Sequence, residues 1–385
     1  MNVGGAWPHA RTILAVRLDG MGDLLMTTPA LRALQERPAT RRLTLLTSPA
    51  GADVARELPF VDEVIPFTAP WMKSAEDEAI SAMAITALVD RLRVREFDAA
   101  IVFTVFTQSA LPAATLVFLA EIPLRAAYCR ENPYTLLTHW LPDPDKDAAS
   151  GVRHEVARQI ALVESVGATV HDERLQFPVR EQARDEMLRK VRAAGMRTDR
   201  PWLVVHPGAT ASSRRYPPAQ FAVAVRALAE TGRWQIAVAG SDADIASANT
   251  IAGAAADVVV LAGLLELPEL AALLQAAQVV VCNNSVAAHL CAAVGTPVVD
   301  LYALTNPQHT PWQVPHRVLC HDVPCRYCLK STCPLGHHRC LANVAPESVV
   351  AAVLSLTTNV AAQDSMDGAF PPPTSEYAMT NGSPA

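Results

Sequence analysis

The sequence predicts an α/β protein with two consecutive Rossmann-like domains, each a doubly wound parallel sheet, that face each other across a central cleft. In both halves, continuous apolar segments of strand length alternate with helical segments, which is typical of parallel sheets covered on both faces. The 385 residues also exceed the roughly 250–300 residues at which a single hydrophobic core stops growing. Ligands are expected in the cleft, at the strand ends of both sheets.

The first half supplies the strands and helices of one such domain, residues 12–180. Thr28 and Pro29 fit the N-cap and first position of a helix, which would leave Asp23 in a short turn before it. The polar, proline-rich residues 141–153 predict a loop. The expected strands are Ile13–Leu18, Leu43–Thr47, Val61–Phe67 and Ala99–Phe103, and the expected helices include Ala30–Glu36, Ile80–Arg95 and His154–Val166.

The second half repeats this pattern over residues 181–358. Each expected strand is followed by a small or polar loop. Residues 363–385 are polar and rich in proline, serine and glycine, which indicates a disordered tail. The expected strands are Trp202–His206, Gln235–Ala239, Val258–Leu261, Val279–Cys282 and Pro297–Leu301.

Composition and charge argue against several classes of function. The net charge of −6 gives no basic face for a nucleic-acid partner. No apolar stretch approaches the ~20 residues of a membrane-spanning helix, and residues 1–11 lack the apolar core of a signal peptide. We therefore expect a cytoplasmic protein.

The stretch Asp19-Gly-Met-Gly-Asp23 interrupts the first strand at the position where α/β proteins bind ligands. A dinucleotide-binding turn would need a third glycine at Leu25, and the second strand would end in an acid rather than in Thr47-Ser48. A phosphate-binding G-x-x-x-x-G-K-[ST] loop and a G-x-S-x-G hydrolase elbow are also absent from the sequence. The turn therefore does not indicate a dehydrogenase, a P-loop enzyme or a common serine hydrolase.

Two loops of the second half have the chemistry of a diphosphate site. The segment His206-Pro-Gly-Ala-Thr-Ala-Ser-Ser-Arg-Arg-Tyr-Pro217 combines a glycine turn, hydroxyls and two guanidinium groups, which suit phosphate oxygens. The segment Asn283-Asn-Ser-Val-Ala-Ala-His289 opens a helix whose N-terminus can hold an anion. Together they predict a nucleotide-diphosphate ligand.

These motifs, in this order, resemble glycosyltransferase family 9, the heptosyltransferases that build the inner core of lipopolysaccharide. The resemblance covers roughly residues 12–355 and implies the two-domain GT-B fold, an ADP-heptose donor held mainly by the second domain, and an inverting, metal-independent transfer. It also implies a lipid-linked core oligosaccharide as acceptor, reached by peripheral contact with the inner membrane's cytoplasmic face. The motifs that carry it are Arg17–Asp23, Thr28–Arg32, His206–Gly208, Arg214–Pro217, Ala239–Asp242, Ala262-Gly263, Asn283–His289, Gly295–Pro297 and the cysteine-rich end.

On the acceptor side, the resemblance makes Asp23 the catalytic base, because an inverting transfer needs a carboxylate to take the proton of the attacking hydroxyl. The alternative role for Asp23 is a helix cap. Arg17, Gly20 and Gly22 are the expected acceptor-binding residues. The basic run Arg91–Arg95 fits either peripheral membrane docking or an ordinary solvated helix face.

On the donor side, either Arg214 or Arg215 is expected to bind the diphosphate, with a solvated surface pair as the alternative. Many family members have Asp-Ser/Thr-Gly where this chain has Asn284-Ser285-Val286, which puts the identity of the donor sugar in doubt. A binding role and a structural role are equally compatible with Thr305–Trp312. The expected donor-binding residues are His206, Gly208, Thr210, Arg214, Arg215, Gly240, Asp242, Asn284, Ser285 and His289.

The eight cysteines fall into two groups. Three are isolated among apolar residues, whereas five crowd into residues 320–340 together with His337 and His338. The C-x2-C spacing in this segment suits zinc, whereas the resembled family acts without a metal. We expect no required cofactor, with a structural zinc on Cys325, Cys328, Cys333 and Cys340 as the open alternative to a packed loop.

Two other functions stay open from the sequence alone. One is a nucleotide-sugar epimerase or hydrolase on the same two-domain architecture, which would need a second acid–base group or a positioned water. The other is a binding protein with a structural zinc that has lost catalysis, an idea prompted by Asn284 and Val286.

Overall fold

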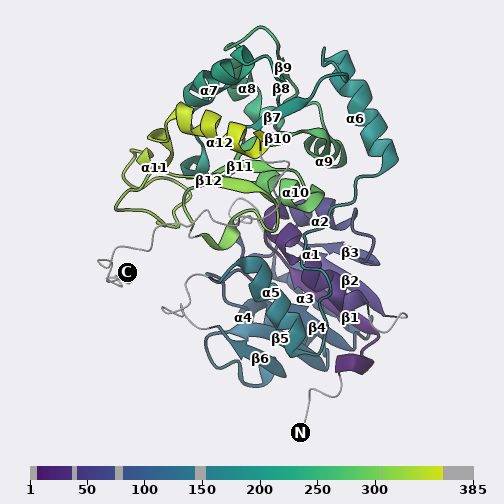
Figure 1. Cartoon of the computed structure of the whole chain (residues 1–385). Helices are drawn as coiled ribbons and strands as arrows, with labels where there is room; N and C mark the ends of the chain where they lie inside the picture. Colours follow the sequence, from purple (N-terminus) through teal and green to yellow (C-terminus); the bar gives the residue numbers. More distant parts are fainter. Residues whose placement is uncertain (1–6, 37–40, 74–80, 144–152, 306, 359–385) are drawn as a thin grey trace.

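The computed structural model describes residues 7–36, 41–73, 81–143, 153–305 and 307–358. It contains two six-stranded sheets, with strand orders β3-β2-β1-β4-β5-β6 and β12-β11-β10-β7-β8-β9. Every paired strand is parallel to its neighbour. The two sheets therefore have the same doubly wound order, and the predicted fold class is confirmed (Figure 1).

The first sheet and its helices form one layered unit. Helices α1, α2 and α5 lie together, and α3 packs with α4. The strands are β1 (Thr12–Arg17), β2 (Arg42–Thr47), β3 (Glu63–Pro66), β4 (Ala99–Val102), β5 (Leu124–Cys129) and β6 (His139–Pro142). The helices are α1 (Met21–Gln35), α2 (Pro49–Ala55), α3 (Ala82–Arg93), α4 (Leu111–Leu119) and α5 (Glu155–Ser165).

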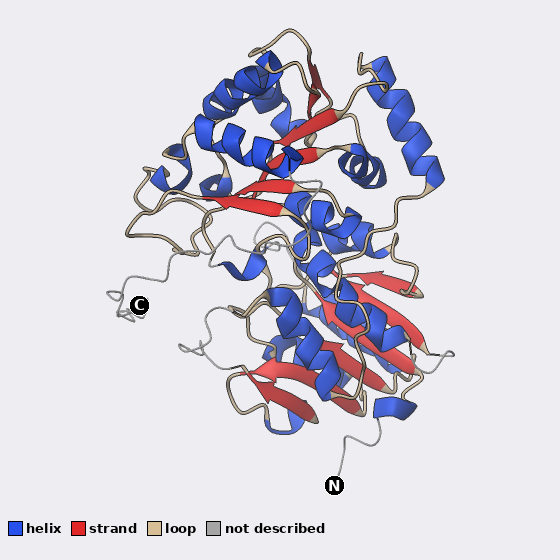
Figure 2. Cartoon of the chain, in the orientation of Figure 1, coloured by secondary structure: helices blue, strands red, loops and turns tan. Residues whose placement is uncertain are grey.

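The second sheet is built in the same way (Figure 2). Helices α7, α8 and α12 pack together, and α9 contacts both α6 and α10. The strands are β7 (Trp202–His206), β8 (Gln235–Val238), β9 (Val258–Val260), β10 (Val279–Asn283), β11 (Val298–Leu301) and β12 (His316–Leu319). The helices are α6 (Glu181–Ala193), α7 (Pro218–Glu230), α8 (Ile245–Ala252), α9 (Leu267–Ala276), α10 (Val286–Val294), α11 (Arg339–Ala342) and α12 (Pro346–Thr358).

Both faces of each sheet are buried. In β1, Ile13 and Ala15 belong to the core beneath α1 and α5, whereas Leu14 and Val16 belong to the core beneath α3 and α4. Successive side chains of a strand point to opposite faces, so a strand covered on both sides must be apolar throughout. The continuous apolar runs in the sequence have this cause.

Helix α1 begins eight residues earlier than Thr28 and Pro29 indicated, and Pro29 lies inside it. Pro29 has no N–H to donate to the Leu25 carbonyl. The Thr28 hydroxyl donates to that carbonyl instead, at 2.7 Å. The expected short turn around Asp23 is therefore wrong, and Asp23 occupies the first turn of α1.

Three strands were missed by the sequence analysis: β5, β6 and β12. Strand β6 includes residues 141 and 142, which were expected to begin a loop. Its burial alternates between partly buried and exposed residues, and all four residues of β12 are only partly buried. Such edge strands lack the continuous apolar run of a central strand. The expected tail, 363–385, lies outside the described residues.

The two domains meet where α1 of the first contacts α10 of the second. A Cβ atom on Gly22 would lie 2.7 Å from Cδ2 of His289, so the contact requires glycine at this position. A second contact joins Trp312 Nε1 to the carbonyl of Glu173 at 2.9 Å. The first turn of α1 is thus held against the second domain.

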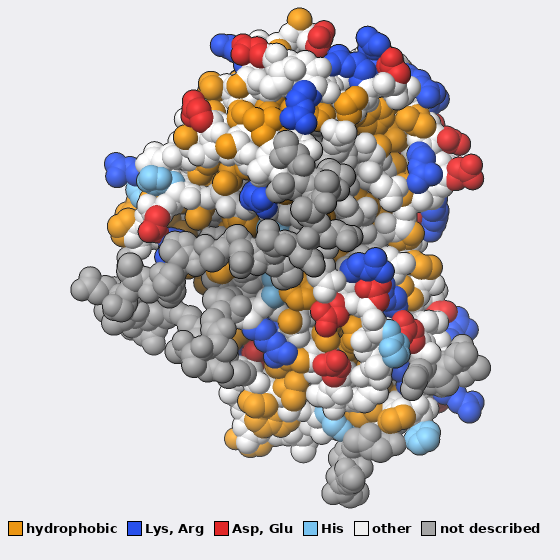
Figure 3. All heavy atoms as spheres, in the orientation of Figure 1, with side chains coloured by type: hydrophobic (Ala, Val, Ile, Leu, Met, Phe, Trp, Pro, Cys, Tyr) orange, Lys and Arg blue, Asp and Glu red, His pale blue; other side chains and the backbone are white. Residues whose placement is uncertain are grey.

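Acidic and basic side chains are interspersed on the face shown in Figure 3, without a large patch of either sign. In the described part of the chain, no helix is both long enough and apolar enough to span a membrane.

We expect Gly22→Ala to reduce the free energy of unfolding by about 1–3 kcal/mol, and so to lower the melting temperature. The reason is that overpacking against His289 outweighs the better helix propensity of alanine. Gly20→Ala is the matched control. Its Cβ would meet Asp23 Oδ2 at 3.7 Å, an ordinary contact. Thermal unfolding of both variants measures the difference. A Gly22→Ala protein as stable as the wild type would contradict the close α1–α10 contact.

Candidate active site

Arg17, the last residue of β1, is the fully buried centre of a charge network. Its Nε lies 2.9 Å from Asp19 Oδ2, and one terminal nitrogen lies 3.2 Å from Glu155 Oε1 and 3.6 Å from Asp23 Oδ1. Burying a guanidinium is costly unless carboxylates compensate it. Three carboxylates do so here, and they fix the strand end and the turn beside it.

Glu155 is the first residue of α5 and is itself fully buried. Besides Arg17, it accepts a hydrogen bond from Gln159 at 2.5 Å and pairs with Arg158 at 3.7 Å. Arg158 also donates to Asp143 at 2.6 Å. The network therefore extends through α5 and holds that helix against the end of β1.

The network shifts the pKa of several of its members. Burial disfavours the charge of Arg17, but Asp19, Glu155 and Asp23 more than offset this and raise the pKa of Arg17. Burial raises the pKa of Asp19 to about 6, against the opposing effect of Arg17. Gln108 steadies Asp19 by donating to its Oδ1.

Asp23 is the member of this group that faces outward, with 28% of its side chain exposed. It is the third residue of α1, and its Oδ2 accepts a hydrogen bond from the Gly20 N–H at 3.3 Å. Burial raises the pKa of Asp23, Arg17 opposes the rise, and Glu155 adds to it. The geometry supports both suggested roles at once, a cap of the helix and an accessible carboxylate of increased basicity.

Arg214, in the short helix Ser212–Arg214, faces Asp23 from the second domain. Its charge lowers the pKa of Asp23 and also that of His289, so the guanidinium acts on residues at the boundary between the domains. The Nε of Arg215 instead donates to the Ala209 carbonyl at 2.7 Å. Of the two arginines, only Arg214 contributes to the pKa shifts of Asp23 and His289.

Six buried side-chain polar atoms of the second domain have no hydrogen-bond partner among the described residues, and two of them are the carboxylate oxygens of Asp300 in β11. The other four lie at the end of β7, in the short helix Ser212–Arg214 and at the start of α10, near the carboxyl ends of strands, where ligands of such sheets bind. Buried polar groups are normally paired, so these four atoms are available to hydrogen-bond a ligand. The atoms are His206 Nδ1, Arg214 Nε, Ser285 Oγ and His289 Nδ1.

Three neutral imidazoles line the boundary between the domains. Burial, His309, His154 and Arg214 lower the pKa of His289 to about 3, and burial and Arg214 lower that of His309 to about 3. The pKa of His154 is lowered to about 4 by burial. The centroids of the His154 and Trp312 rings are 4.4 Å apart, and His154 Nε2 contacts the Thr310 carbonyl at 2.9 Å. Thr310 and Trp312 thus contact the first domain.

Gly208 and Gly240 make room for one carboxylate, that of Asp244. A Cβ on Gly208 would lie 2.5 Å from Asp244 Oδ2, and one on Gly240 would lie 2.8 Å from the Asp244 Cβ. Asp244 accepts hydrogen bonds from Ser241 at 2.8 and 2.9 Å. Asp242 packs against Gly263. Gly208 and Gly240 therefore allow the Asp244 side chain to pack against the loops that follow β7 and β8.

The remaining expected donor-side residues have varied environments. The buried amide of Asn284 donates to the Ala303 carbonyl at 3.4 Å and to Thr305 Oγ1 at 3.3 Å, so it joins the β10 and β11 loops. Ser285 is the N-cap residue of α10, and Val286 is its first residue. Thr210 is exposed at the tip of its loop.

A cavity of about 280 Å³ lies beside the network in the first domain. Its lining includes Trp71, Met72, Thr104, Thr107 and Gln108. Gln108 also donates to Asp19, so the cavity adjoins the segment that leads from β1 to α1. A mostly apolar cavity with a few hydroxyl and amide groups is typical of a small-molecule site.

Sequence reasoning missed Glu155, Arg158, Gln108 and Asp244, and it gave His309 no separate role within Thr305–Trp312. Glu155 and Gln108 act through partners far away in the sequence, Arg17 and Asp19. The buried acid Asp300 was missed as well; burial raises its pKa to about 8.

Comparison with known proteins agrees with this architecture. A family model described as glycosyltransferase family 9 (heptosyltransferase) matches residues 85–339. Lipopolysaccharide heptosyltransferase 2 of Escherichia coli is 26% identical over 350 residues, covering 88% of this chain and 96% of that protein.

Two solved structures show the same fold. The glycosyltransferase family 9 protein of Veillonella parvula has a TM-score of 0.75 at 19% identity, over 91% of this chain and 98% of that one. The E. coli heptosyltransferase WaaC was solved with ADP-2-deoxy-2-fluoro heptose. It has a TM-score of 0.67 at 19% identity, covering 89% of this chain and 99% of that one. The chain belongs to glycosyltransferase family 9, the heptosyltransferases, and has their GT-B fold.

Proposed function

We propose that this glycosyltransferase moves a heptose, with inversion, from ADP-heptose to a lipopolysaccharide core-type acceptor, and that Asp23 is the catalytic base. The observation that carries the proposal is an accessible carboxylate of raised pKa on one domain, near enough to Arg214 of the other domain for that arginine to lower its pKa. A transfer of this kind needs both a proton acceptor and a cation for the departing diphosphate.

In the proposed reaction, the acceptor hydroxyl attacks the anomeric carbon from the face opposite the diphosphate. Asp23 takes the hydroxyl proton as the new C–O bond forms. Its raised pKa makes it a stronger base, and Arg17 keeps the carboxylate oriented. The role of Arg17 is therefore to position Asp23, since its fully buried guanidinium cannot reach an acceptor.

The ADP leaving group gains negative charge as the glycosidic bond breaks. Arg214, the Ser285 hydroxyl and the N-terminus of α10 lie on the side of the cleft that would stabilise it. The unpartnered Arg214 Nε and Ser285 Oγ are the donors that the diphosphate would satisfy.

The donor assignment draws support from relatives. The E. coli heptosyltransferase with the same fold was solved with an ADP-heptose analogue. The absence of an acid at Asn284 is accommodated here, because its amide is committed to the β11 loop.

The acceptor is assigned to the cavity beside Gln108, next to the segment that leads from β1 to α1. A lipid-linked acceptor would bring the enzyme to the cytoplasmic face of the inner membrane. The Arg91–Arg95 run does not provide an obvious docking surface, because its arginines pair with Glu63, Asp90 and Glu121.

We expect Asp23→Asn to reduce acceptor-dependent release of ADP by about 10²–10⁴-fold, because the amide cannot accept the proton. Binding of ADP should persist. Asp53→Asn, which alters an exposed carboxylate on α2, is the control and should keep full activity. Rates within tenfold of the wild type for Asp23→Asn would exclude this residue as the base. Release of free or epimerised sugar without acceptor would favour a hydrolase or epimerase.

We expect Arg214→Ala to weaken ADP binding by about 10–100-fold, the loss of a charge-assisted contact of 1.5–3 kcal/mol. Arg215→Ala should bind ADP almost as the wild type does, since its side chain serves the Ala209 carbonyl. Calorimetric titration of both variants with ADP measures this difference. Equal losses in the two variants would contradict the assignment of Arg214 to the diphosphate.

A further inference from the structure

The cysteine-rich segment after β12 encloses a second, smaller cavity. Its volume is about 30 Å³, the space of a single water molecule or ion. Five cysteines and three histidines contribute to its lining, a combination typical of zinc sites rather than of catalytic clefts. The residues are Cys320, Cys325, Cys328, Cys333, Cys340, His321, His337 and His338.

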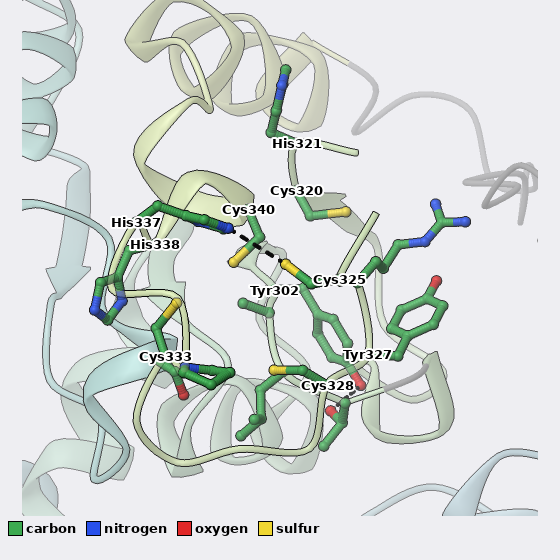
Figure 4. Close-up of a pocket in the computed structure, with 16 residues that line it drawn as sticks. Tyr302, Cys320, His321, Cys325, Tyr327, Cys328, Cys333, His337, His338 and Cys340 are labelled. Atoms are coloured by element: carbon green, nitrogen blue, oxygen red, sulfur yellow. Dashed lines mark hydrogen bonds between the residues drawn. The ribbon is translucent and has the colours of Figure 1, made fainter. Parts of the chain in front are cut away.

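Two potential ligands already have the separation of partners on one metal ion. Cys325 Sγ lies 3.6 Å from His337 Nε2. Tetrahedral zinc, with its usual bond lengths to sulfur and nitrogen, places such a pair about 3.6 Å apart. Figure 4 shows Cys325, Cys340 and His337 directed toward one another from different parts of the segment, whereas the sulfurs of Cys320, Cys328 and Cys333 lie apart from this group.

Among the described residues, no three metal-binding side chains yet converge on one point. Cys325, Cys328 and Cys333 lie outside helices and strands, between β12 and α11. Their positions are therefore not fixed by a helix or a strand. Metal binding commonly completes such a site while the thiols lose their protons.

We propose that Cys325, Cys340 and His337, together with Cys328 of the C-x2-C pair, bind one structural divalent metal ion of the zinc type, with Cys333 beside it. The ion is not part of the transfer reaction. It holds the cysteine-rich segment in one conformation, as structural zinc does in small loop-rich regions.

The site also braces the loop that carries Arg214. Between Cys328 and Cys333, the carbonyls of Lys330 and Ser331 accept hydrogen bonds from Ser213, at 2.8 and 3.1 Å. Lys73 of the first domain donates to Ser331 Oγ at 2.6 Å. If Arg214 binds the diphosphate as proposed, loss of the ion should weaken donor binding as well as stability.

The test is the metal content of the full chain, purified with added zinc and measured by mass spectrometry. We expect about one ion per chain, and a loss of most of it in Cys328→Ser and Cys340→Ser. Cys320→Ser, which alters a thiol in the same cavity, is the matched control and should retain the ion. If the variants fail to fold, cobalt titration of the wild-type apoprotein still reports the number of thiolate ligands through its charge-transfer bands.

Removal of the ion by a chelator should lower the melting temperature, and zinc should restore it. A chain without bound metal and with all thiols reactive would overturn the proposal, as would a disulfide within the set or equal metal loss in Cys320→Ser. A metal-bound chain that does not bind ADP would leave the site standing and contradict the proposed donor.

Discussion

The buried guanidinium of Arg17 is the interaction on which the rest of the site depends. A charge that is wholly removed from water must be compensated, and losing one partner of such a group typically costs about 3–5 kcal/mol. Asp19, Asp23 and Glu155 provide the compensation from the turn and from α5. The same contacts hold β1, the turn and α5 together, so the stability of the first domain and the placement of Asp23 have one cause.

The two domains divide the proposed chemistry between them. The first supplies a carboxylate whose basicity is increased by burial and by Glu155. The second supplies Arg214, and polar atoms of its loops are unpaired among the described residues. Gly22 allows His289 to approach α1, which brings these two sets of groups to one cleft. A single domain of this fold would lack one half of the machinery.

The fold could be predicted from the sequence because strands buried on both faces must be apolar throughout, and such runs are recognisable. Strands β6 and β12 were not predicted, because they are at most partly buried and so lack a continuous apolar run. The start of α1 was misplaced because a hydroxyl of Thr28 compensates for Pro29, a local exchange that propensities do not capture. No sequence pattern indicates the role of Glu155, since its contact with Arg17 joins residues 138 positions apart in the chain. That contact forms only when α5 packs against the end of β1. The choice between Arg214 and Arg215 likewise required the structure, which shows the contact of Arg215 with the Ala209 carbonyl.

The most direct test of this account is the pH dependence of kcat/KM for sugar transfer in the wild type and in Glu155→Gln. Loss of activity on the acidic side should follow protonation of Asp23, at a pH above the 3.8 of an ordinary aspartate, because burial and Glu155 raise its pKa. Removing the charge of Glu155 should move this acidic limb to lower pH. An acidic limb that stays in place, or that moves to higher pH, would contradict the claim that the Arg17 network sets the basicity of Asp23.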